Sequence, residues 1–332
     1  MNKICVAQIG TSRNSHGNFV FGSLRKQSSL FEVAGVAFPE NEEEKYPEQT
    51  AAFDGVPRLT VEQLLSDPSI EAVTVETEEK YLTKYAALAV KAGKHIHMEK
   101  PGGTDEAAFD ALIDTVKAAG TVFHTGYMYR FNPVLQELFR RIEAGELGEI
   151  ISVEAQMNCI EPEHLRQWLG EYPGGMMFFL GCHLADLVYR IQGRPLAVHP
   201  FCRATGVNGT AGLDYGMAVW DYGHGVSLIK TSAYEIGGFS RRQLVVTGTK
   251  GTVEVNPLER YVEGGSDMFT GMTERFESSW LDNGVQSTCA PFDRYDSMMA
   301  HFAARIHGLP ETVYTPDYEK ELYHLMRQSC GK

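Results

Sequence analysis

Residues 3–17 read KICVAQIGTSRNSHG, an apolar segment that runs directly into a loop of glycine and small polar residues. The apolar run over 3–9 predicts a strand, and the segment over 18–26 has the periodicity of a helix. A strand that reaches a helix through such a loop brings backbone N–H groups to the helix N-terminus. This first unit decides the fold, because the same alternation of strand and helix repeats downstream.

Short apolar strands alternate with helical segments through the first 125 residues. This order is typical of an α/β fold with a doubly wound parallel sheet, covered by helices on both faces. We predict Thr60 as a helix N-cap and helix ends at Gly93 and Gly120. Residues 40–44 are expected to form an acidic loop. The further elements expected here are strands over 31–38, 72–76, 94–98 and 122–125 and helices over 59–65, 80–92 and 105–119.

The pattern changes after Arg130, where strands follow one another with few helices between them. Such a series suggests a mostly antiparallel sheet with helices on one face, an α+β domain. We therefore predict a Rossmann-type domain over 1–125 and an α+β domain over 126–332. The elements expected in the second domain are strands over 149–160, 197–204, 216–220, 226–233, 242–247 and 251–255, helices over 134–144, 175–191, 293–306 and 316–330, and a turn over 145–148.

Composition argues against several classes of function. The chain of 332 residues has a formal net charge of −13, which disfavours nucleic acid or an anionic membrane surface as its main partner. The sequence holds no run of about 20 apolar residues that could span a bilayer. The first residues enter the predicted first strand at once, so we expect no leader segment. Six scattered cysteines form no CxxC pair and are interpreted as reduced thiols, so we expect a cytoplasmic protein.

The loop over 10–17 carries part of a nucleotide-binding signature. A Rossmann loop usually reads GxGxxG, because glycines let the backbone close on a pyrophosphate at a helix N-terminus. Here Gly10 matches the first glycine, while Ser12 and Ser15 stand where the second and third are expected. Small hydroxyls and backbone N–H groups can still hold an anion, with Ser15 as a helix N-cap. The alternative is an ordinary strand–helix turn without a ligand.

The second strand lacks the acidic residue that commonly binds the adenosine ribose of a dinucleotide. Phe38 stands where an aspartate is usual, so the ribose anchor is absent or shifted to Glu40. Phe38 either stacks on the adenine or belongs to the core. It offers no carboxylate to repel a 2′-phosphate, and no arginine follows directly to bind one. The sequence therefore leaves both NAD and NADP open.

The strongest motif is AGKHIHMEKP over 92–101. A strand that ends in Glu-Lys-Pro places Lys100 at the carboxyl edge of a parallel sheet, where ligands bind in such folds. A lysine held there near a nicotinamide can pass a proton to or from a substrate oxygen and favour its negative charge. Pro101 is a candidate for a cis peptide bond that fixes the turn. The alternative for a lone lysine is a solvated surface charge.

A second reactive side chain is expected on the helix that follows the Gly174-Gly175 pair. Helical spacing places His183 on one face with Phe179, one turn before it, and with Asp186, nearly one turn after it. The paired glycines allow a backbone or a ligand to approach closely. We interpret His183 as a site residue, and the alternative is a core histidine hydrogen-bonded to Asp186.

Together these motifs resemble the glucose–fructose oxidoreductase / inositol dehydrogenase family (Gfo/Idh/MocA), over nearly the whole chain. The resemblance implies a Rossmann domain followed by an α/β domain with a large open sheet, often used for oligomerisation. It also implies reversible hydride transfer between NAD(P) and a hydroxyl-bearing carbon of a sugar, amino sugar or cyclitol. The segments that carry it are AGKHIHMEKP at 92–101, GYMYRFNP at 126–133, GELGEI at 145–150, GGMMFFLGCHLADL at 174–187 and GTKGTVEV at 248–255.

The resemblance assigns the two catalytic positions to Lys100 and His183. The family usually has an aspartate four residues before that histidine, where this chain has Phe179. With the loop serines and Phe38, this makes three departures at functional positions, which suggests altered chemistry. Arg130 is equally explained as a structural ion-pair partner. The expected substrate contacts are Tyr127, Arg130 and Trp168, and the expected cofactor contacts are Gly10, Thr11, Ser12, Asn14, Ser15, Phe38, Thr77 and Glu99.

The leading hypothesis is an NAD(P)-dependent oxidoreductase, with NAD slightly favoured, in which Lys100 exchanges the proton and His183 assists. The partners expected are a carbohydrate or cyclitol substrate and further copies of the chain, in a homodimer or homotetramer. One alternative is a redox-neutral lyase or hydrolase on the same fold, motivated by Phe179 and the loop serines. Another is a non-catalytic sensor, since fold does not fix function. We expect no metal, because a metal-using version would need an unusual ligand set drawn from Glu161, Glu163, His164 and His183.

Overall fold

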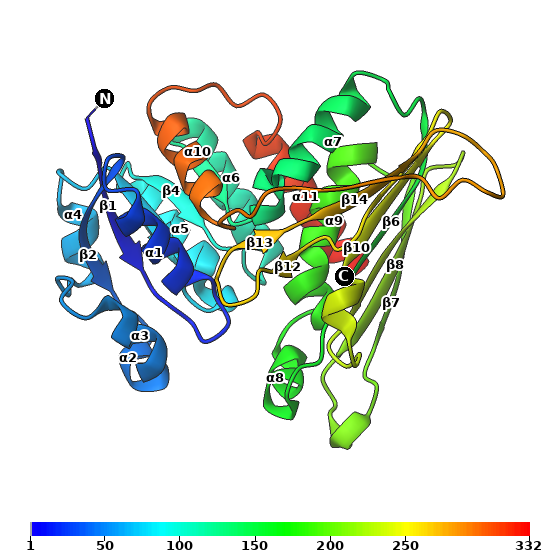
Figure 1. Ribbon diagram of the computed structural model, residues 1–332. Helices are drawn as coiled ribbons and strands as arrows, with labels where there is room; N and C mark the ends of the chain where they lie inside the picture. The colour runs from blue at the N-terminus through cyan, green and yellow to red at the C-terminus, as the bar shows by residue number, and fades with distance from the viewer. Residues whose placement is uncertain (1) are drawn as a thin grey trace. The chain divides into compact units, whose positions relative to one another are not determined.

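The computed structural model describes residues 2–332, which divide into two compact units (Figure 1). The first unit comprises the described residues up to Met128 together with Tyr295–Glu321. The second unit comprises Tyr129–Arg294 and Leu322–Lys332. The chain therefore builds most of the first unit, then the second, and returns to the first near its end.

This return differs from the expected division, which placed all of 126–332 in one second domain. The hydroxyl of Ser23 donates to the carboxylate of Asp296 at 2.8 Å, and that of Thr125 donates to Glu319 at 2.9 Å. These contacts tie residues 295–321 to the first unit. A helical pattern in the sequence indicates an apolar face but does not say which core that face enters. The division by role, into a cofactor-binding and a substrate-binding domain, stays a prediction.

The first unit is built on a five-stranded parallel sheet, which confirms the predicted Rossmann-type sheet. All four residues of β3 are buried, as expected for a strand covered on both faces. The strand order is β2 (Phe31–Ala37), β1 (Ile4–Ile9), β3 (Ala72–Val75), β4 (His95–Met98) and β5 (Phe123–Thr125). The helices are α1 (Gly17–Lys26), α2 (Glu42–Lys45), α3 (Pro47–Thr50), α4 (Val61–Ser66), α5 (Leu82–Lys91), α6 (Glu106–Ala119), α10 (Asp296–Ile306) and the start of α11 (Pro316–Ser329).

Several helix ends lie where the sequence predicted them. Thr60 caps α4 in a capping box: its side chain accepts the N–H of Gln63 at 3.1 Å, and the Gln63 side chain accepts the N–H of Thr60 at 2.8 Å. Gly120 ends α6 with a left-handed φ of 64°, and Gly93 follows α5 with a φ of 75°. The expected acidic loop over 40–44 is wrong in part, because α2 begins inside it. A helix of four residues is too short to show a periodic pattern.

The second unit contains an eight-stranded sheet, in which β6 and β9 pair in parallel and the other neighbours pair antiparallel. This confirms the predicted large, mostly antiparallel sheet. Figure 1 shows α7 (Pro133–Glu143) and α9 (Cys182–Gln192) along one face of it. The strand order is β15 (Val285–Thr288), β14 (Gly271–Arg275), β11 (Thr252–Val255), β10 (Gln243–Gly248), β6 (Ile150–Asn158), β9 (Val226–Ser232), β8 (Tyr215–Asp221) and β7 (Ala197–Arg203).

The second unit also departs from the sequence expectation in places. The helix expected over 175–191 is divided into a π-helical turn, Met177–Gly181, and α9. A π-turn has the same apolar composition as an α-turn, so the pattern does not reveal it. Short elements were not predicted at all, because they are too brief or too exposed to show a period. They are α8 (Glu163–Trp168), β12 (Arg260–Tyr261), β13 (Met268–Phe269), β14 and β15.

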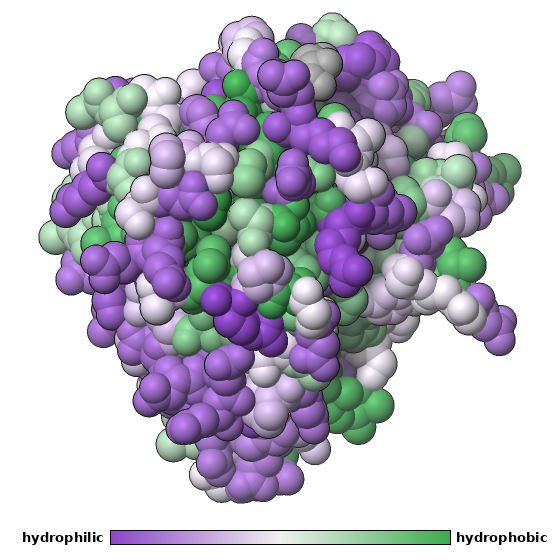
Figure 2. Space-filling view, turned by 90° about the vertical axis from the view of Figure 1, so that its left-hand side faces the viewer, coloured by the Kyte–Doolittle hydropathy of each residue, from purple (hydrophilic) through white to green (hydrophobic). Residues whose placement is uncertain are grey.

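The molecular surface is mainly hydrophilic on the face that Figure 2 shows, as expected for a chain in which 22% of the residues are charged. Hydrophobic residues lie between the hydrophilic ones on this face. Within residues 2–332, no helix combines the length and the apolar character needed to cross a membrane. The six cysteines are free thiols, and Cys159, Cys182 and Cys330 are buried.

We predict that Thr60→Ala lowers the free energy of unfolding by about 1 kcal/mol, because the backbone N–H of Gln63 in the first turn of α4 loses its side-chain partner. Urea unfolding followed by circular dichroism measures the change. Thr60→Ser keeps the capping oxygen and is the matched control, for which we expect little loss. Equal destabilisation by both substitutions would show that the capping oxygen does not stabilise α4.

Candidate active site

The motif residues of the first unit meet at one edge of the parallel sheet. β3 lies between β1 and β4, with Val75 paired to Ile9 on one side and to Met98 on the other. The chain therefore leaves these strands side by side, into the glycine loop, the segment over 76–81 and the Glu-Lys-Pro turn. This is the edge at which parallel sheets bind ligands.

Gly10 is required by a close approach of two backbones. Its φ is +84°, and an added Cβ would lie 2.4 Å from Cγ2 and 2.8 Å from Cα of Thr77. Thr77 is fully buried, so it has no room to withdraw. The structure thus accounts for the first glycine of the loop, and it brings together two of the predicted cofactor contacts.

Ser12 and Ser15 hold the loop closed where glycines were expected. The N–H of Ser12 donates to Oγ of Ser15 at 3.1 Å, and the N–H of Ser15 donates to Oγ of Ser12 at 3.0 Å. Oγ of Ser15 also accepts the N–H of Gly17 at 3.2 Å. The prediction of Ser15 as helix N-cap is wrong, because α1 begins at Gly17 and His16 precedes it. Ser15 binds across the loop instead, and anion binding by this loop, with Asn14 half-buried in it, stays a prediction.

Lys100 and Glu99 form a buried ion pair at the end of β4. Their side chains are 1% and 2% exposed, and Nζ of Lys100 lies 3.4 Å from Oε1 of Glu99. Nδ1 of His16 lies 3.4 Å from the same oxygen. Burial alone would raise the pKa of Glu99, but His16 and Lys100 lower it below its ordinary value. An ionised Glu99 favours the charged form of the neighbouring lysine. The Lys100–Pro101 peptide bond is cis, as predicted.

Three buried ionisable groups beside this pair were not singled out from the sequence. Glu76 and His97 are fully buried, with 3.6 Å between Oε1 and Nε2. Burial and the charge of Glu99 raise the pKa of Glu76 well above its ordinary value, and burial raises the pKa of Glu79 to about 7. Burial lowers the pKa of His97 to about 4. Carboxylates placed directly after a buried strand were the available signal for Glu76 and Glu79.

The end of β2 shows how the chain uses Phe38 in place of an aspartate. The half-buried ring of Phe38 packs edge-on against Phe53, with centroids 5.2 Å apart, and the guanidinium of Arg58 lies 4.9 Å from its centroid. Packing against the core therefore accounts for Phe38, and stacking on adenine stays a prediction. Glu40 accepts Nζ of Lys84 and the hydroxyl of Tyr85, each at 2.7 Å. The suggested substitute anchor is thus engaged elsewhere.

His183 and Asp186 of α9 face the segment that opens the second unit. The buried ring of His183 lies edge-on to Tyr129, with centroids 5.1 Å apart. Nε of Arg130 donates to Oδ2 of Asp186 at 2.9 Å, and Nη2 donates to Oδ1 at 2.8 Å. The structural interpretation of Arg130 is therefore confirmed. Substrate contact by Arg130, and by Tyr127 of the first unit, stays a prediction.

Phe179 belongs to an apolar cluster rather than to a charged site. Its ring lies edge-on to Trp168, with centroids 5.4 Å apart and an interplanar angle of 89°. A carboxylate at this position would be removed from water among apolar side chains. A substrate contact by the half-buried Trp168 stays a prediction. The cluster also contains Cys159, Leu169, Met176, Leu180 and Ala233.

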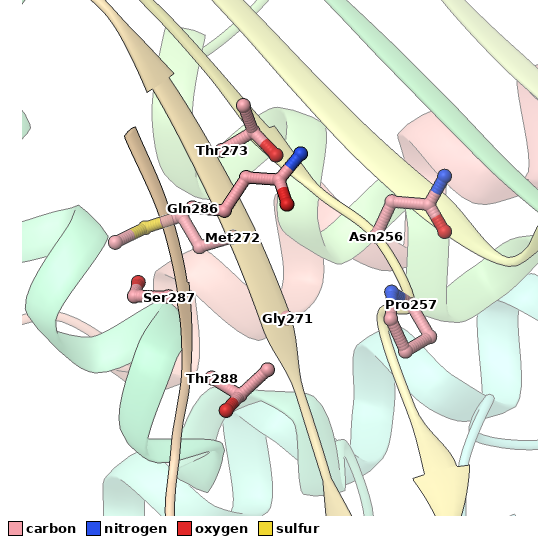
Figure 3. A pocket seen from close by; sticks show the side chains of 8 residues that line it. All are labelled: Asn256, Pro257, Gly271, Met272, Thr273, Gln286, Ser287 and Thr288. Atoms are coloured by element: carbon pink, nitrogen blue, oxygen red, sulfur yellow. The ribbon is translucent and has the colours of Figure 1, made fainter. Parts of the chain in front are cut away.

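A pocket of about 310 Å³ opens elsewhere in the second unit, over β14 and β15 (Figure 3). None of its lining residues is ionisable, and none is a predicted site residue, so we do not place the chemistry there. Within residues 2–332, no group of three or more His, Cys, Asp or Glu residues is arranged to hold a metal ion. The pocket is lined by Asn256, Pro257, Gly271, Met272, Thr273, Gln286, Ser287 and Thr288.

Two sequence models of protein families match the chain. Residues 4–127 match "Oxidoreductase family, NAD-binding Rossmann fold", and residues 135–254 match "GFO/IDH/MocA C-terminal domain". Both models describe parts of one family, and together they cover well over half of the chain.

Similar proteins include two sugar or cyclitol dehydrogenases. D-xylose 1-dehydrogenase (NADP(+)) 2 of Haloferax volcanii is 26% identical over 304 residues, which cover 89% of this chain and 86% of the relative. A scyllo-inositol 2-dehydrogenase (NADP(+)) of Bacillus subtilis is 24% identical over 212 residues, covering 62% and 57%.

Solved structures show the same fold. Levoglucosan dehydrogenase, in complex with NADH and levoglucosan, superposes with a TM-score of 0.78 at 18% identity, covering 99% of this chain and 98% of that one. An oxidoreductase from Thermotoga maritima superposes with a TM-score of 0.77 at 16% identity, covering 99% and 96%.

We predict that Asp186→Ala lowers the free energy of unfolding by about 3–5 kcal/mol, because it leaves the buried Arg130 without its carboxylate. The double variant Arg130→Met, Asp186→Leu removes both charges and should recover most of that loss. Denaturant unfolding of the three proteins measures the difference. If the double variant is no more stable than Asp186→Ala, the unpaired charge is not the cause of the loss.

We predict that His97 makes the protein less stable in acid. Its pKa is about 4 in the folded protein, against an ordinary value of 6.5, because burial of the ring disfavours its charged form. Between these pH values the unfolded chain binds a proton that the folded chain does not. Stability present above pH 6.5 therefore falls as the pH drops towards 4, by up to about 1.4 kcal/mol per pH unit.

Thermal unfolding between pH 8 and pH 4 tests this dependence with His97→Gln, which does not titrate. The variant should lose stability less steeply than the wild-type chain below pH 6.5. His307→Gln, at an exposed position after α10, is the control and should leave the slope unchanged. Parallel stability curves for His97→Gln and wild type would contradict the assignment.

Proposed function

Since this chain belongs to the Gfo/Idh/MocA family of NAD-binding oxidoreductases, we propose that it transfers hydride between NAD(P) and a hydroxyl-bearing carbon of a sugar, amino sugar or cyclitol. Its relatives include enzymes named for xylose and for scyllo-inositol, and a solved structure of the same fold is a levoglucosan dehydrogenase. These compounds share a ring or chain of secondary alcohols, which is the substrate class that we propose.

The first unit offers residues that fit a dinucleotide. Gly10 lets the loop turn tightly against Thr77 at the sheet edge, which is the role of the first glycine in a dinucleotide-binding loop. The ion pair at the end of β4 lies at the same sheet edge. We propose that the cofactor is held by Gly10, Thr11, Ser12, Asn14, Ser15, Phe38, Thr77 and Glu99. When bound, its nicotinamide accepts the hydride from an alcohol or supplies it to a ketone.

The single observation that carries the proposal is the burial of Lys100 beside Glu99. Oxidation of a secondary alcohol releases a hydroxyl proton as well as a hydride, and a lysine nitrogen can take that proton. In the reverse direction, the charged lysine donates its proton to the carbonyl oxygen and favours the negative charge that develops there. Glu99 is a positioning residue that holds the lysine in place for this proton exchange. We propose that His183 assists by orienting the substrate hydroxyl.

Phe179 adds nothing to this proton chemistry. A carboxylate at that position could orient or polarise the catalytic pair, and a phenyl ring cannot. We therefore propose that Lys100 exchanges the proton and that His183 assists, and we propose substrate contacts from Tyr127, Arg130 and Trp168. We further propose that the enzyme is a cytoplasmic homodimer or homotetramer that uses NAD.

We predict that Lys100→Met lowers turnover at least about 100-fold on the best substrate of a polyol and cyclitol panel, because the proton acceptor is lost. Absorbance of NAD(P)H measures turnover, and calorimetry measures cofactor affinity, which should change only a few-fold. Lys91→Met removes an exposed lysine from α5 and serves as the control. Full turnover by Lys100→Met would refute the assignment.

A further inference from the structure

Glu42 is a buried carboxyl group that lies against the glycine loop. Its side chain comes from α2, and the residue is 1% exposed. Oε2 of Glu42 accepts the N–H of Thr11 at 3.1 Å, and Thr11 directly follows Gly10. Glu42 lies on the segment that connects β2 to β3, and its carboxyl group reaches the loop that follows β1. In a typical Rossmann domain the carboxyl group that binds the ribose comes from the end of β2 instead.

The other oxygen of this carboxyl group, Oε1, is buried and has no hydrogen-bond partner among the described residues. A buried polar atom without a partner costs free energy, so such an atom is uncommon unless a ligand or water completes it. Oε2 of Glu42 accepts a hydrogen bond from the glycine loop, and Oε1 can accept one from a hydroxyl group of a ligand. A vicinal diol supplies two such donors.

The two residues that could otherwise bind a ribose are accounted for. Phe38 has no polar atom in its side chain and packs against Phe53. Glu40 is held by Lys84 and Tyr85. Of the residues that follow β2 and are considered for the ribose, Glu42 is the one that keeps a buried carboxyl oxygen without a hydrogen-bond partner among the described residues.

The charges around Glu42 disfavour a further anion. Burial raises the pKa of Glu42 to about 8, the backbone N–H of Thr11 and the charge of Lys45 lower it, and the charges of Glu40 and Glu78 raise it. A 2′-phosphate would bring more negative charge beside three carboxyl groups. Arg58, the cation near Phe38, is engaged by Glu43 at 3.0 Å and by the carbonyl of Phe53 at 2.8 Å.

We propose that Glu42 binds the adenosine ribose hydroxyls of the dinucleotide and makes the enzyme select NAD over NADP. This inference rests on the proposed function, because it assumes that the first unit binds a dinucleotide. In this proposal, Glu42 of α2 takes the role of the aspartate that usually stands at the end of β2. Its role is recognition of the cofactor and includes no step of the reaction.

Isothermal titration of the purified full-length chain with NAD+, NADP+ and 2′-deoxy-NAD+ tests the proposal. Wild type should bind NAD+ at least about tenfold more tightly than either analogue, since each analogue removes or blocks one ribose hydroxyl. Glu42→Ala should lose about tenfold in NAD+ affinity and should no longer distinguish NAD+ from the deoxy analogue. This loss of discrimination shows that the residue and the hydroxyl interact with each other.

Two further variants separate this role from folding and from net charge. Glu42→Gln keeps the shape but replaces one accepting oxygen by an NH2 donor and removes the charge that Glu42 carries above its pKa of about 8, so in titrations above pH 8 the preference for NAD+ over NADP+ should narrow. Glu44→Ala removes an exposed carboxylate from the same helix, and its affinities should stay within twofold of wild type. Circular dichroism spectra confirm that each variant is folded.

The outcomes distinguish the inference from the function on which it rests. If wild type binds neither NAD+ nor NADP+, the proposed function fails. If wild type binds NAD+ and Glu42→Ala binds it equally well, the function stands and the role of Glu42 is refuted. A wild-type preference for NADP+ would likewise overturn the selection that we assign to Glu42.

Discussion

The proposed chemistry depends on the buried ion pair between Lys100 and Glu99 at the end of β4. Two charges removed from water are tolerated only when each is compensated, and here the nitrogen and oxygen lie 3.4 Å apart with His16 at the same carboxylate. The charge of Glu99 and the burial of this region together influence whether Glu76 and His97 are charged. Glu76, beside a second carboxylate in the same buried region, has a raised pKa, while His97 has a lowered one. Glu99 thus holds the buried lysine at the sheet edge where we propose that it meets a substrate oxygen.

The three departures from the family pattern have local physical explanations. The two loop serines bind each other's backbone N–H groups and so close a loop that glycines were expected to form. Phe38 and Phe179 both pack against aromatic neighbours, where a carboxylate would lose its hydration. In the first unit, Glu42 supplies a carboxyl group from another element. These findings favour an oxidoreductase whose cofactor and site contacts differ from the family pattern, rather than a non-catalytic protein of the same fold.

Much of the fold could be predicted from local pattern, because strand–helix alternation and the caps at Thr60 and Gly120 depend on neighbouring residues. The same holds for Gly10 and Lys100, whose motifs are continuous in sequence. Glu42 could not be found in this way, since its helix has four residues and its burial depends on contact with Thr11. Nor could the return of residues 295–321 to the first unit, because tertiary contacts decide which core a helix enters.

The most direct test of the central claim is to follow the hydride itself. NADH or NADPH deuterated at nicotinamide C4 would be incubated with the protein and a panel of keto-sugars and inososes, and the products analysed by mass spectrometry. The account predicts that deuterium moves from the cofactor to the carbinol carbon of a product, with one oxidised cofactor formed for each product molecule. A substrate that is converted while the cofactor keeps its deuterium would contradict it and would indicate redox-neutral chemistry on this fold.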